Sequence, residues 1–562
     1  MTSPVTPLTS PTPLNPQPSR VVYGKWPMSQ TTDRNETQPG APRTAQQAPV
    51  MRLADVVASV SLATDLATGQ VLEHGLRRAL LAVWLGEEIG LSREALSEVY
   101  YVALLGTIGC AMEAAAFSQY VEDEIAVGER LSKVDPTSQM KIAAFFLGQA
   151  AAAGGPLERA KKVAAVATSG DQSARVCRDV SVQIADMLDL GPAIRAALGQ
   201  CHEQWNGKGP RGLSGDALSM PIRLYQVARD AEVFSRTGGL DAALAVARDR
   251  SGKQYDPRIV EAFIPRAPLL LHRLESESTW DAVLAAEPVP IRRLTSDEFN
   301  HMAVAIANFI DARSPYTLGH SRAVASLAQG AARHLGLTEA EATIVGRAGL
   351  LHDLGRAGVP VTTWDKKTPL SPTELERVKK HPSMTELILA RSDALGHLGT
   401  LAGMHHERLD GSGYRGLTGS FLPVAARILA TADAYQSKLE RRPYREALPE
   451  DAAAEWLRAE ADAGRLDADS VRAILAAAGR EEPRVQEPWP VGLTDREVEV
   501  LQLAVQGLSN RDIASTLVVS PKTVGRHIER IYEKTGVSTR VGATLFALQH
   551  GLLDAMAVQR SA

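Results

Sequence analysis

The chain has 562 residues and a formal net charge of -4, with 44% hydrophobic and 22% charged residues. This length excludes a single ordinary domain, and this composition excludes a wholly disordered chain. The acidic balance excludes nucleic-acid binding through bulk charge, so any DNA contact requires a local basic patch.

Residues 1–50 contain ten of the 32 prolines among many Ser, Thr and Gln residues. Such a segment buries too little apolar surface to offset the entropy of ordering, so it predicts a disordered leader. Met51 follows it directly, and translation from Met51 instead of Met1 is an alternative.

The longest apolar run, Tyr100 to Met112, is too short to span a bilayer and predicts a buried helix. No signal peptide is visible, so we expect a cytoplasmic protein with no membrane partner. The three cysteines, Cys110, Cys177 and Cys201, lie far apart in the sequence. Their spacing excludes a disulfide scaffold and a zinc knuckle, and it favours a reducing compartment.

Two Ala- and Leu-rich blocks with helical periodicity cover residues 51–273 and 291–480. Polar, proline-containing stretches at 274–290 and 481–490 are predicted as linkers, and a compact block covers 491–562. The expected fold is all-α, with two tandem helical bundles followed by a four-helix domain.

The two bundles are predicted to be repeats of one domain. When His74 is set on His320, Gly90 falls on Gly336 and Leu105 on Leu351 without a gap. Further along, CHEQWNGKGPRGLSG from Cys201 matches HHERLDGSGYRGLTG from His405.

The second bundle carries a set of residues that predicts a metal site. Imidazoles and carboxylates suit Fe, Mn, Zn or Ni, although any one of these histidines alone is better explained as an ordinary surface or core residue. Side chains adjacent on a helix diverge by about 100°, so a His-Asp pair suits two ions bridged by the carboxylate. The set is His320, His352, Asp353, His381, His405, His406 and Asp433.

The segment Thr295 to Ala447 resembles the HD-GYP family of metal-dependent phosphohydrolases. The matching motifs are YTLGHS (316–321), LLHDLGRAGVP (350–360), LSPTELERVKKHP (370–382), HHERLDGSGYRGLTG (405–419) and ARILATADAYQSKLERRPY (426–444). The resemblance implies a helical bundle around an iron or manganese centre that hydrolyses cyclic di-GMP or a related phosphodiester. It implies that the seven residues are metal ligands, that His352, Asp353 and Arg356 are catalytic, and that Arg356, Gly411, Gly413, Tyr414 and Arg415 bind substrate.

Three positions depart from the family pattern. Arg356 replaces the family lysine, and it shares a helix face with His352 if that helix continues past Gly355. Arg415 replaces the proline of the Gly-Tyr-Pro motif. Tyr316 stands where three-metal members have a glutamate, so we expect two divalent ions, Fe or Mn.

The first bundle keeps His74 and His202 but has Gly106 and Thr107 in place of His352 and Asp353. Cys201 replaces His405, and Arg229 aligns with Asp433. This copy is therefore predicted to be a degenerate partner that packs, dimerises or senses. A mononuclear site of His74, Cys201 and His202 is the alternative.

The C-terminal block predicts a helix-turn-helix. Thr494 caps a first helix, Ser509 or Asn510 caps a short helix at 512–517, and Pro521 begins a longer one. Lys522, Arg526, Arg530 and Lys534 recur every four residues, and this spacing alone fits DNA binding and a solvated face equally well.

This block resembles the LuxR-type helix-turn-helix domain in LTDREVEVLQL, GLSNRDIAS, SPKTVGRHI and KTGVSTR. The resemblance implies a recognition helix at 521–535 and a role in transcription regulation. The residues it places at DNA are Asn510, Lys522, Thr523, Arg526, His527 and Arg530.

Taken together, the sequence predicts a bacterial transcription regulator with a cyclic-dinucleotide phosphodiesterase domain. The expected partners are double-stranded DNA, a cyclic dinucleotide or other phosphodiester, and a second copy of the chain. Two alternatives are a metal-bound ligand sensor with little turnover and a scaffold whose bundles only dimerise.

Overall fold

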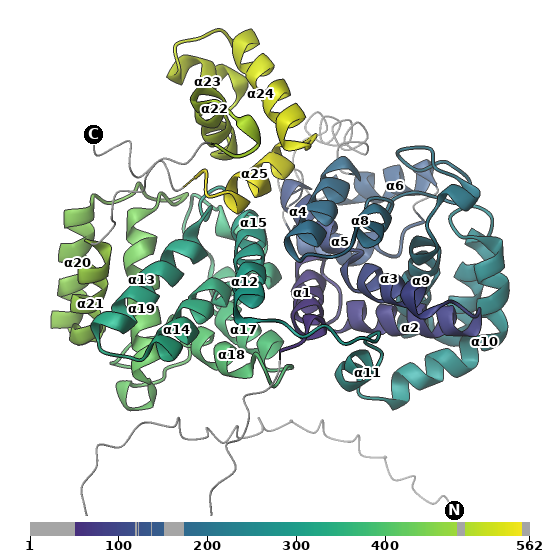
Figure 1. The fold of residues 1–562 in the computed structure, drawn as a ribbon, viewed down its shortest axis with the longest axis horizontal. Coiled ribbons are helices and arrows are strands. Elements are labelled where there is room, and N and C mark those ends of the chain that lie inside the picture. Colours follow the sequence, from purple (N-terminus) through teal and green to yellow (C-terminus); the bar gives the residue numbers. More distant parts are fainter. Residues whose placement is uncertain are drawn as a thin grey trace, which may run out of the picture. The chain divides into compact units, whose positions relative to one another are not determined.

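The computed structural model describes residues 51–117, 121, 123–135, 138–150, 174–479 and 489–553. Within these ranges every regular element is a helix, and the β-type pairs are isolated bridges (Figure 1). The all-α prediction is confirmed. The leader at 1–50 and most of the linker at 481–490 lie outside the described residues.

The first bundle is built on helices whose apolar faces meet in a core of Leu, Val and Ala side chains. Its described elements are α1 (Leu53–Ala67), α2 (His74–Glu88), α3 (Arg93–Leu105), α4 (Ile108–Phe117), α5 (Glu124–Leu131), α6 (Gln139–Ala150), α8 (Pro192–Leu198), η1 (Gly215–Ala217), α9 (Met220–Arg250), α10 (Pro257–Ser276) and α11 (Thr279–Ala285).

The stretch 274–290, predicted as a linker, is largely helical. The helix α10 continues to Ser276 and α11 follows almost at once. Trp280 and Val283 of α11 are buried, so this segment belongs to the first bundle. Its charged residues other than the buried Glu287 are exposed, which is why its composition resembled that of a linker.

The segment Arg93–Met112 is the one candidate membrane span, by length and composition, within the described ranges. It covers α3 and the start of α4, and 67% of its most apolar window is buried inside the structure. The predicted buried helix at Tyr100 to Met112 is in fact two helices, because α3 ends at Leu105 and α4 begins at Ile108.

The second bundle repeats this plan and contains the candidate metal ligands. Its elements are α12 (Ser296–Asp311), α13 (His320–His334), α14 (Glu339–Leu351), η2 (Leu354–Gly358), α15 (Val361–Trp364), α16 (Pro372–Lys379), α17 (His381–Leu389), α18 (Gly396–Ala402), η3 (Gly419–Phe421), α19 (Val424–Leu439), α20 (Glu450–Asp462) and α21 (Ala468–Ala478). The helix α13 packs against α14, α19 and α21.

The repeat is visible in local geometry as well as in sequence. The helices α2 and α13 both have 15 residues and both begin at a histidine, which follows a left-handed residue: Glu73 at φ 77° and Gly319 at φ 79°. The helices α3 and α14 both have 13 residues. The two copies therefore present their first histidine from the same kind of helix start.

A glycine-rich loop is also duplicated. It follows His405 and His406 in the second bundle and Cys201 and His202 in the first. Both oxygens of Glu203 accept backbone hydrogen bonds, from Arg211 and Leu213. Both oxygens of Glu407 accept the corresponding bonds from Arg415 and Leu417, at 2.8 Å each. This buried glutamate therefore holds the glycine-rich loop in the same shape in both bundles.

The C-terminal domain has the four predicted helices around one apolar core. They are α22 (Asp495–Val505), α23 (Asn510–Thr516), α24 (Pro521–Thr535) and α25 (Arg540–Gln549), preceded by η4 (Pro490–Gly492). The limits of α24 confirm the helix predicted at 521–535. The helix α23 starts two residues earlier than predicted because Ser509, not a later residue, caps it.

Candidate metal centre

Seven side chains from five helices and their ends converge inside the second bundle. His320 opens α13, His381 opens α17, and Asp433 lies in the middle of α19. The remaining four follow helix ends: His352 and Asp353 come after α14, and His405 and His406 after α18. Of these seven residues only His406 is more than marginally exposed.

Asp353 stands between two groups of histidines. Its Oδ2 lies 3.5 Å from Nε2 of His352 and 3.7 Å from Nε2 of His320. Its Oδ1 lies 3.4 Å from Nε2 of His381 and 3.7 Å from Nε2 of His405. One carboxylate therefore faces both groups, one oxygen to each.

Asp433 spans the same two groups from another side. Its Oδ1 lies 3.2 Å from Nε2 of His320, and its Oδ2 lies 3.4 Å from Nδ1 of His406. His320, His352 and Asp353 can hold one ion, and His381, His405 and His406 can hold another. Two carboxylates that each serve both positions are the arrangement that a dinuclear centre requires.

Three imidazoles are oriented by backbone carbonyls of the preceding turn. The Nδ1 atoms of His352, His381 and His405 donate to the carbonyls of Gly349, Val378 and Ala402 at 2.6 to 2.7 Å. This fixes the tautomer, so each Nε2 carries a lone pair and no proton.

Two of these lone pairs face one another. Nε2 of His381 and Nε2 of His405 are 3.0 Å apart, and neither has a proton to share because Nδ1 carries it in both rings. Nε2 of His352 is buried without a hydrogen-bond partner. Ligands that bind one ion at about 2.1 Å and at a right angle are about 3.0 Å apart, so a cation between them fits this arrangement.

His320 is oriented by a carboxylate instead. Both oxygens of Glu440 lie at 3.1 and 3.0 Å from its Nδ1, which leaves Nε2 directed toward Asp433. Burial lowers the pKa of His320, but Glu440 and Asp433 outweigh this and raise it to about 10. A carboxylate behind an imidazole makes that imidazole a stronger metal ligand.

Three other groups of the cluster are in the protonation states that metal binding needs. Burial, together with the neighbouring charges of His352 and His381, lowers the pKa of His405 to about 3. Burial opposes ionisation of Asp353 and Asp433, but their histidine neighbours hold both pKa values well below the usual range. A neutral His405 therefore lies beside the ionised carboxylate of Asp353.

The sequence placed Arg356 on the same helix face as His352 only if the helix continued past Gly355. The helix does not continue that far. The helix α14 ends at Leu351, and the tighter turn η2 then carries Arg356. Its guanidinium lies 3.2 Å from Oδ2 of Asp353 and stacks on the Trp364 ring, 3.9 Å from the centroid. A cation is thus placed beside the bridging carboxylate.

The glycine-rich loop brings one of its predicted residues to the cluster. The Tyr414 ring lies 4.5 Å from the His406 ring. Gly413 packs so tightly that a Cβ there would lie 2.5 Å from the Glu407 Cα, and Gly411 adopts φ 79° in the turn. The guanidinium of Arg415 is paired with Glu386 at 2.5 Å instead of pointing to the histidines.

The first bundle holds no equivalent dinuclear site in its described residues. His74 contacts Glu232 through a short hydrogen bond, and the carboxylate next to Arg229, Asp230, is occupied by Arg229, Arg250 and Tyr255. His202 does lie in a group that can hold a metal, but the other members are Cys110 and Cys177, and Cys201 adjoins the group through Cys177 at 3.8 Å. His74 is not among them, which argues against the alternative site predicted from the sequence.

The recognition helix α24 presents its basic residues to solvent. Lys522, Arg526 and Arg530 are exposed, whereas Val524 and Ile531 are buried in the domain core. Asn510 is exposed at the start of α23, and Thr523 pairs its hydroxyl with Ser520 at 2.8 Å. His527 differs from the prediction in part, because its Nδ1 is buried without a partner.

Sequence reasoning missed the residues that orient the ligands. Glu440 and the three carbonyl groups carry no motif of their own, and only packing places them behind the imidazoles. It also missed the cysteine cluster, although one signal was readable. Cys177 precedes Cys201 by 24 residues, as His381 precedes His405 by 24.

Comparisons with known proteins find matches for both the second bundle and the C-terminal domain. Residues 305–470 match the family model for the HD domain, and residues 491–547 match that for bacterial regulatory proteins of the luxR family. The chain is 30% identical over 411 residues to 3'3'-cGAMP-specific phosphodiesterase 3 of Vibrio cholerae serotype O1, covering 71% of this chain and 89% of that protein.

Two further relatives extend the comparison. The cyclic di-GMP phosphodiesterase response regulator RpfG of Xanthomonas campestris pv. campestris is 33% identical over 262 residues, 46% of this chain and 67% of that protein. The crystal structure of a cyclic GMP-AMP specific phosphodiesterase from V. cholerae superposes with a TM-score of 0.53 at 25% identity. It covers 77% of this chain and 99% of that one.

Proposed function

Because this chain belongs to the HD-GYP family of metal-dependent phosphohydrolases and carries a LuxR-type domain, we propose that it is a DNA-binding regulator that hydrolyses a 3',3'-linked cyclic dinucleotide. The observation that carries the proposal is the position of Asp353 between two histidine groups. That arrangement suits in-line displacement at a phosphodiester, for which two bound divalent ions would supply positive charge.

We assign the centre two divalent ions, Fe or Mn, held by His320, His352, Asp353, His381, His405, His406 and Asp433. The donor set of imidazole nitrogens and carboxylate oxygens, with no sulfur, supports this assignment. When bound, the ions would lower the pKa of a water molecule and offset charge on the phosphate.

The protein groups around the centre have separable roles in the proposal. Arg356 neutralises Asp353 and donates to the phosphate oxygens, which a guanidinium can bind in a bidentate manner. Burial raises the pKa of Tyr414 to about 12, so its hydroxyl stays protonated and donates to the substrate. Gly411 and Gly413 shape the loop that carries Tyr414 and Arg415 toward the nucleotide.

The class of nucleotide follows from the relatives. Relatives named as specific for 3'3'-cGAMP and relatives named for cyclic di-GMP both match this chain, and the match to 3'3'-cGAMP-specific phosphodiesterase 3 covers 411 residues, against 262 for RpfG. We therefore propose 3'3'-cGAMP as the first substrate to test and cyclic di-GMP as the second.

The test is turnover by the purified full chain, loaded with Fe or Mn under reducing, anaerobic conditions. Chromatography should show a linear dinucleotide or mononucleotides, and His352→Ala and Asp353→Ala should each abolish the product. His334→Ala, at the exposed end of α13, is the matched control and should retain full activity. Nucleotide binding without turnover supports the sensor alternative, and binding of neither metal nor nucleotide leaves only the scaffold.

The C-terminal domain is the proposed output domain, through which the protein would bind DNA. We propose that α24 enters the major groove, with Lys522, Thr523, Arg526 and His527 near bases and phosphates and Arg530 on the backbone. Asn510, at the start of α23, is assigned a phosphate contact. Since both the nucleotide and the DNA are cytoplasmic, we place the protein in the cytoplasm.

A further inference from the structure

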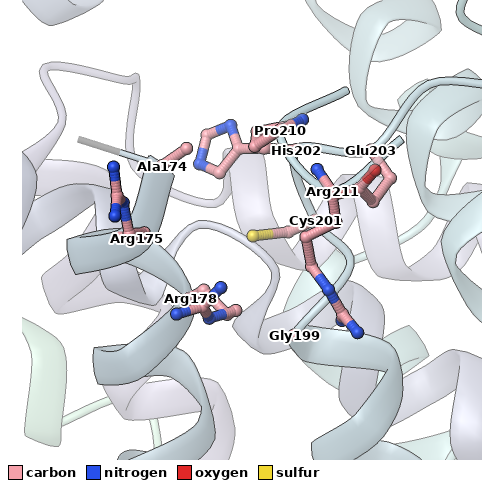
Figure 2. Close-up of a pocket in the computed structure, with 9 residues that line it drawn as sticks. All are labelled: Ala174, Arg175, Arg178, Gly199, Cys201, His202, Glu203, Pro210 and Arg211. Atoms are coloured by element: carbon pink, nitrogen blue, oxygen red, sulfur yellow. The ribbon is translucent and has the colours of Figure 1, made fainter. Parts of the chain in front are cut away.

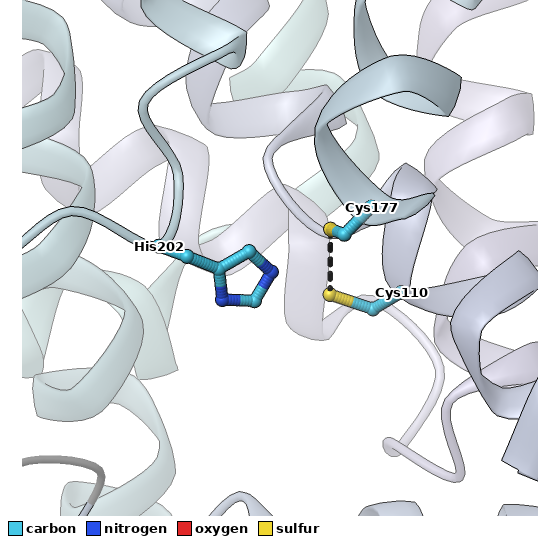
Figure 3. Close-up of side chains that lie close together, drawn as sticks. All are labelled: Cys110, Cys177 and His202. Carbon is cyan, nitrogen blue, oxygen red and sulfur yellow. Dashed lines mark hydrogen bonds between the residues drawn. The ribbon is translucent and has the colours of Figure 1, made fainter. Parts of the chain in front are cut away.

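All three cysteines of the chain lie close together in the first bundle, with Cys177 near both of the others. Sγ of Cys110 lies 3.4 Å from Sγ of Cys177, which lies 3.8 Å from Sγ of Cys201. His202 joins them, because one of its ring nitrogens lies within 4.8 Å of the sulfurs of Cys110 and Cys177 (Figure 3). Cys177 and Cys201 are buried, and Cys110 is half-buried.

This cluster occupies the place that half of the metal centre has in the second bundle. Cys201 and His202 align with His405 and His406, and the spacing of 24 residues sets Cys177 on His381. Backbone contacts agree: a Cβ on Gly109 would lie 2.0 Å from the Cys177 carbonyl oxygen, and one on Gly355 would lie 2.0 Å from that of His381.

Cys110, the remaining member of the cluster, also has a counterpart in the second bundle. The register that sets Gly109 on Gly355 sets Cys110 on Arg356, so a thiol stands where the catalytic bundle has a guanidinium. The other half of the centre is lost, because Gly106 and Thr107 replace His352 and Asp353. The first bundle has therefore exchanged a two-ion set of nitrogen and oxygen donors for a one-ion set rich in sulfur.

The geometry suits a single ion, because ligand atoms of Cys110, Cys177 and His202 lie within 4.8 Å of one another and Cys201, 3.8 Å from Cys177, can supply a fourth donor. Sulfurs bound to zinc at about 2.3 Å in a tetrahedron are about 3.8 Å apart, close to the two observed separations of 3.4 and 3.8 Å. Nε2 of His202 is buried without a hydrogen-bond partner, which is costly for a polar atom unless a ligand completes it. A disulfide fits less well, because its sulfurs would have to be about 2.05 Å apart.

The cluster is also accessible to an ion. Cys201 and His202 line a cavity of about 280 Å³, whose other walls include Arg175, Arg178 and Arg211 (Figure 2). These three lining arginines place positive charge beside the cluster, which suits the negative charge of a site with three thiolates.

We propose that Cys110, Cys177, Cys201 and His202 form a binding site for one zinc-class cation in the first bundle. Three thiolates and one imidazole are a common donor set of structural zinc sites. The site ties α4, the helical residues 174–187 and the loop after α8 together, so it stabilises the copy that has lost the dinuclear centre. This inference is independent of the proposed phosphodiesterase activity.

The test uses cobalt as a probe of the full chain after metal removal, under reducing, anaerobic conditions. Cobalt bound by thiolate shows a charge-transfer absorption band, and the dinuclear centre has no sulfur donor, so any such band reports on the cysteine cluster alone. We expect the band to reach a plateau by three equivalents of cobalt per chain, one for the cysteine cluster and two for the proposed dinuclear centre, and to vanish when zinc is added in excess.

Cys177→Ser should lose the band, and His202→Ala should weaken binding at least tenfold, an estimate based on the loss of one of four ligands. His272→Ala, which changes a histidine outside the cluster, should leave it unchanged. Cys177→His restores the ligand type of the other bundle and should keep one ion with a weaker band, which separates ligand loss from misfolding. Absence of the band in the wild type, its persistence in Cys177→Ser, or a Cys110–Cys177 disulfide under these conditions would overturn the proposal.

Discussion

Glu440 illustrates how a residue outside every motif can control the metal ligands. Its two oxygens hold Nδ1 of His320, and its own position is held by Gln436 at 2.9 Å and Arg442 at 2.7 Å. The imidazole therefore cannot rotate away from Asp433 without breaking a buried ion pair. Such an orienting carboxylate commonly matters almost as much as the ligand itself.

We predict that Glu440→Gln lowers metal affinity by about 10–100-fold, because the amide can still accept a hydrogen bond but no longer supplies charge. The measurement is competition with a chelator, followed by metal analysis. Glu446→Gln, which changes an exposed glutamate nearby, serves as the control. Equal affinities for the two variants would show that Glu440 has no part in metal binding.

A second prediction concerns Asp65, which is buried in the first bundle. Burial, only partly offset by Arg78 and by the hydrogen bond from the Gly75 backbone, raises its pKa from 3.8 to about 8. Between these two values the folded chain holds a proton that the unfolded chain has released. The contribution to stability is therefore complete below pH 3.8 and is lost as the pH rises toward 8.

Asp65→Asn should accordingly flatten the decline in the unfolding midpoint between pH 5 and pH 8, since an amide cannot ionise. Thermal unfolding at three pH values in that window, recorded with Asp249→Asn as an exposed control, measures this. If the wild type and Asp65→Asn lose stability in parallel, then Asp65 is ionised in the folded protein.

The seven candidate ligands were readable from the sequence because each lies in a short, distinctive motif. Their orienting partners were not, since the carbonyl of Gly349 or the carboxylate of Glu440 acquires its role only from packing. The cysteines show the same limit. Spacings of 67 and 24 residues match no local metal motif, and only the bundle brings the three sulfurs together.

At the scale of single elements, α24 shows how one helix can serve two surfaces. Ser520 caps it by accepting a hydrogen bond from the Thr523 backbone, and Val524 and Ile531 anchor it in the core. Lys534, which the spacing placed in the basic stripe, is instead paired with Glu497 at 2.7 Å. The residues of the stripe outside this ion pair are Lys522, Arg526 and Arg530, and these three are the proposed DNA contacts.

We predict that Arg526→Ala weakens binding to an operator duplex by roughly tenfold or more and makes the affinity less dependent on salt, because a charged contact is lost. Fluorescence anisotropy at several salt concentrations measures both effects. Arg333→Ala, an exposed arginine in the second bundle, is the control. An unchanged affinity would mean that Arg526 is only solvated.

Helix limits were predictable wherever a capping residue marked them, as at Ser520 and Thr494. They were not predictable where tertiary contacts decided. The segment at 274–290 looked like a linker but forms α11, since Trp280 and Val283 find a place in the core. The turn at Gly355 ends α14 because its backbone approaches that of His381.

At the scale of the whole molecule, one helical plan supports two different donor sets. The second bundle presents nitrogen and oxygen donors and the first presents mainly sulfur, while the helices, the left-handed starts and the glutamate-held loops are shared. Divergence has therefore changed the ligands and kept the frame. The frame is determined by buried apolar contacts that the ligand substitutions leave in place.

We predict that the full chain is a homodimer, because LuxR-type domains read two-fold DNA sites and a two-fold protein matches them. Sedimentation velocity should give a mass of about twice 60.2 kDa at micromolar concentration. A mass that stays at the single-chain value, with or without operator DNA, would contradict this.

The shared carboxylate of Asp353 has a consequence for how the enzyme responds to metal supply. In the proposed two-ion centre, an ion held by either histidine group would fix one oxygen of Asp353 and so leave the other oxygen placed for a second ion. Loading should then be all-or-none, with empty and doubly filled chains coexisting when metal is scarce. A shortage of metal would then lower the number of active chains, while the turnover rate of each active chain would stay the same.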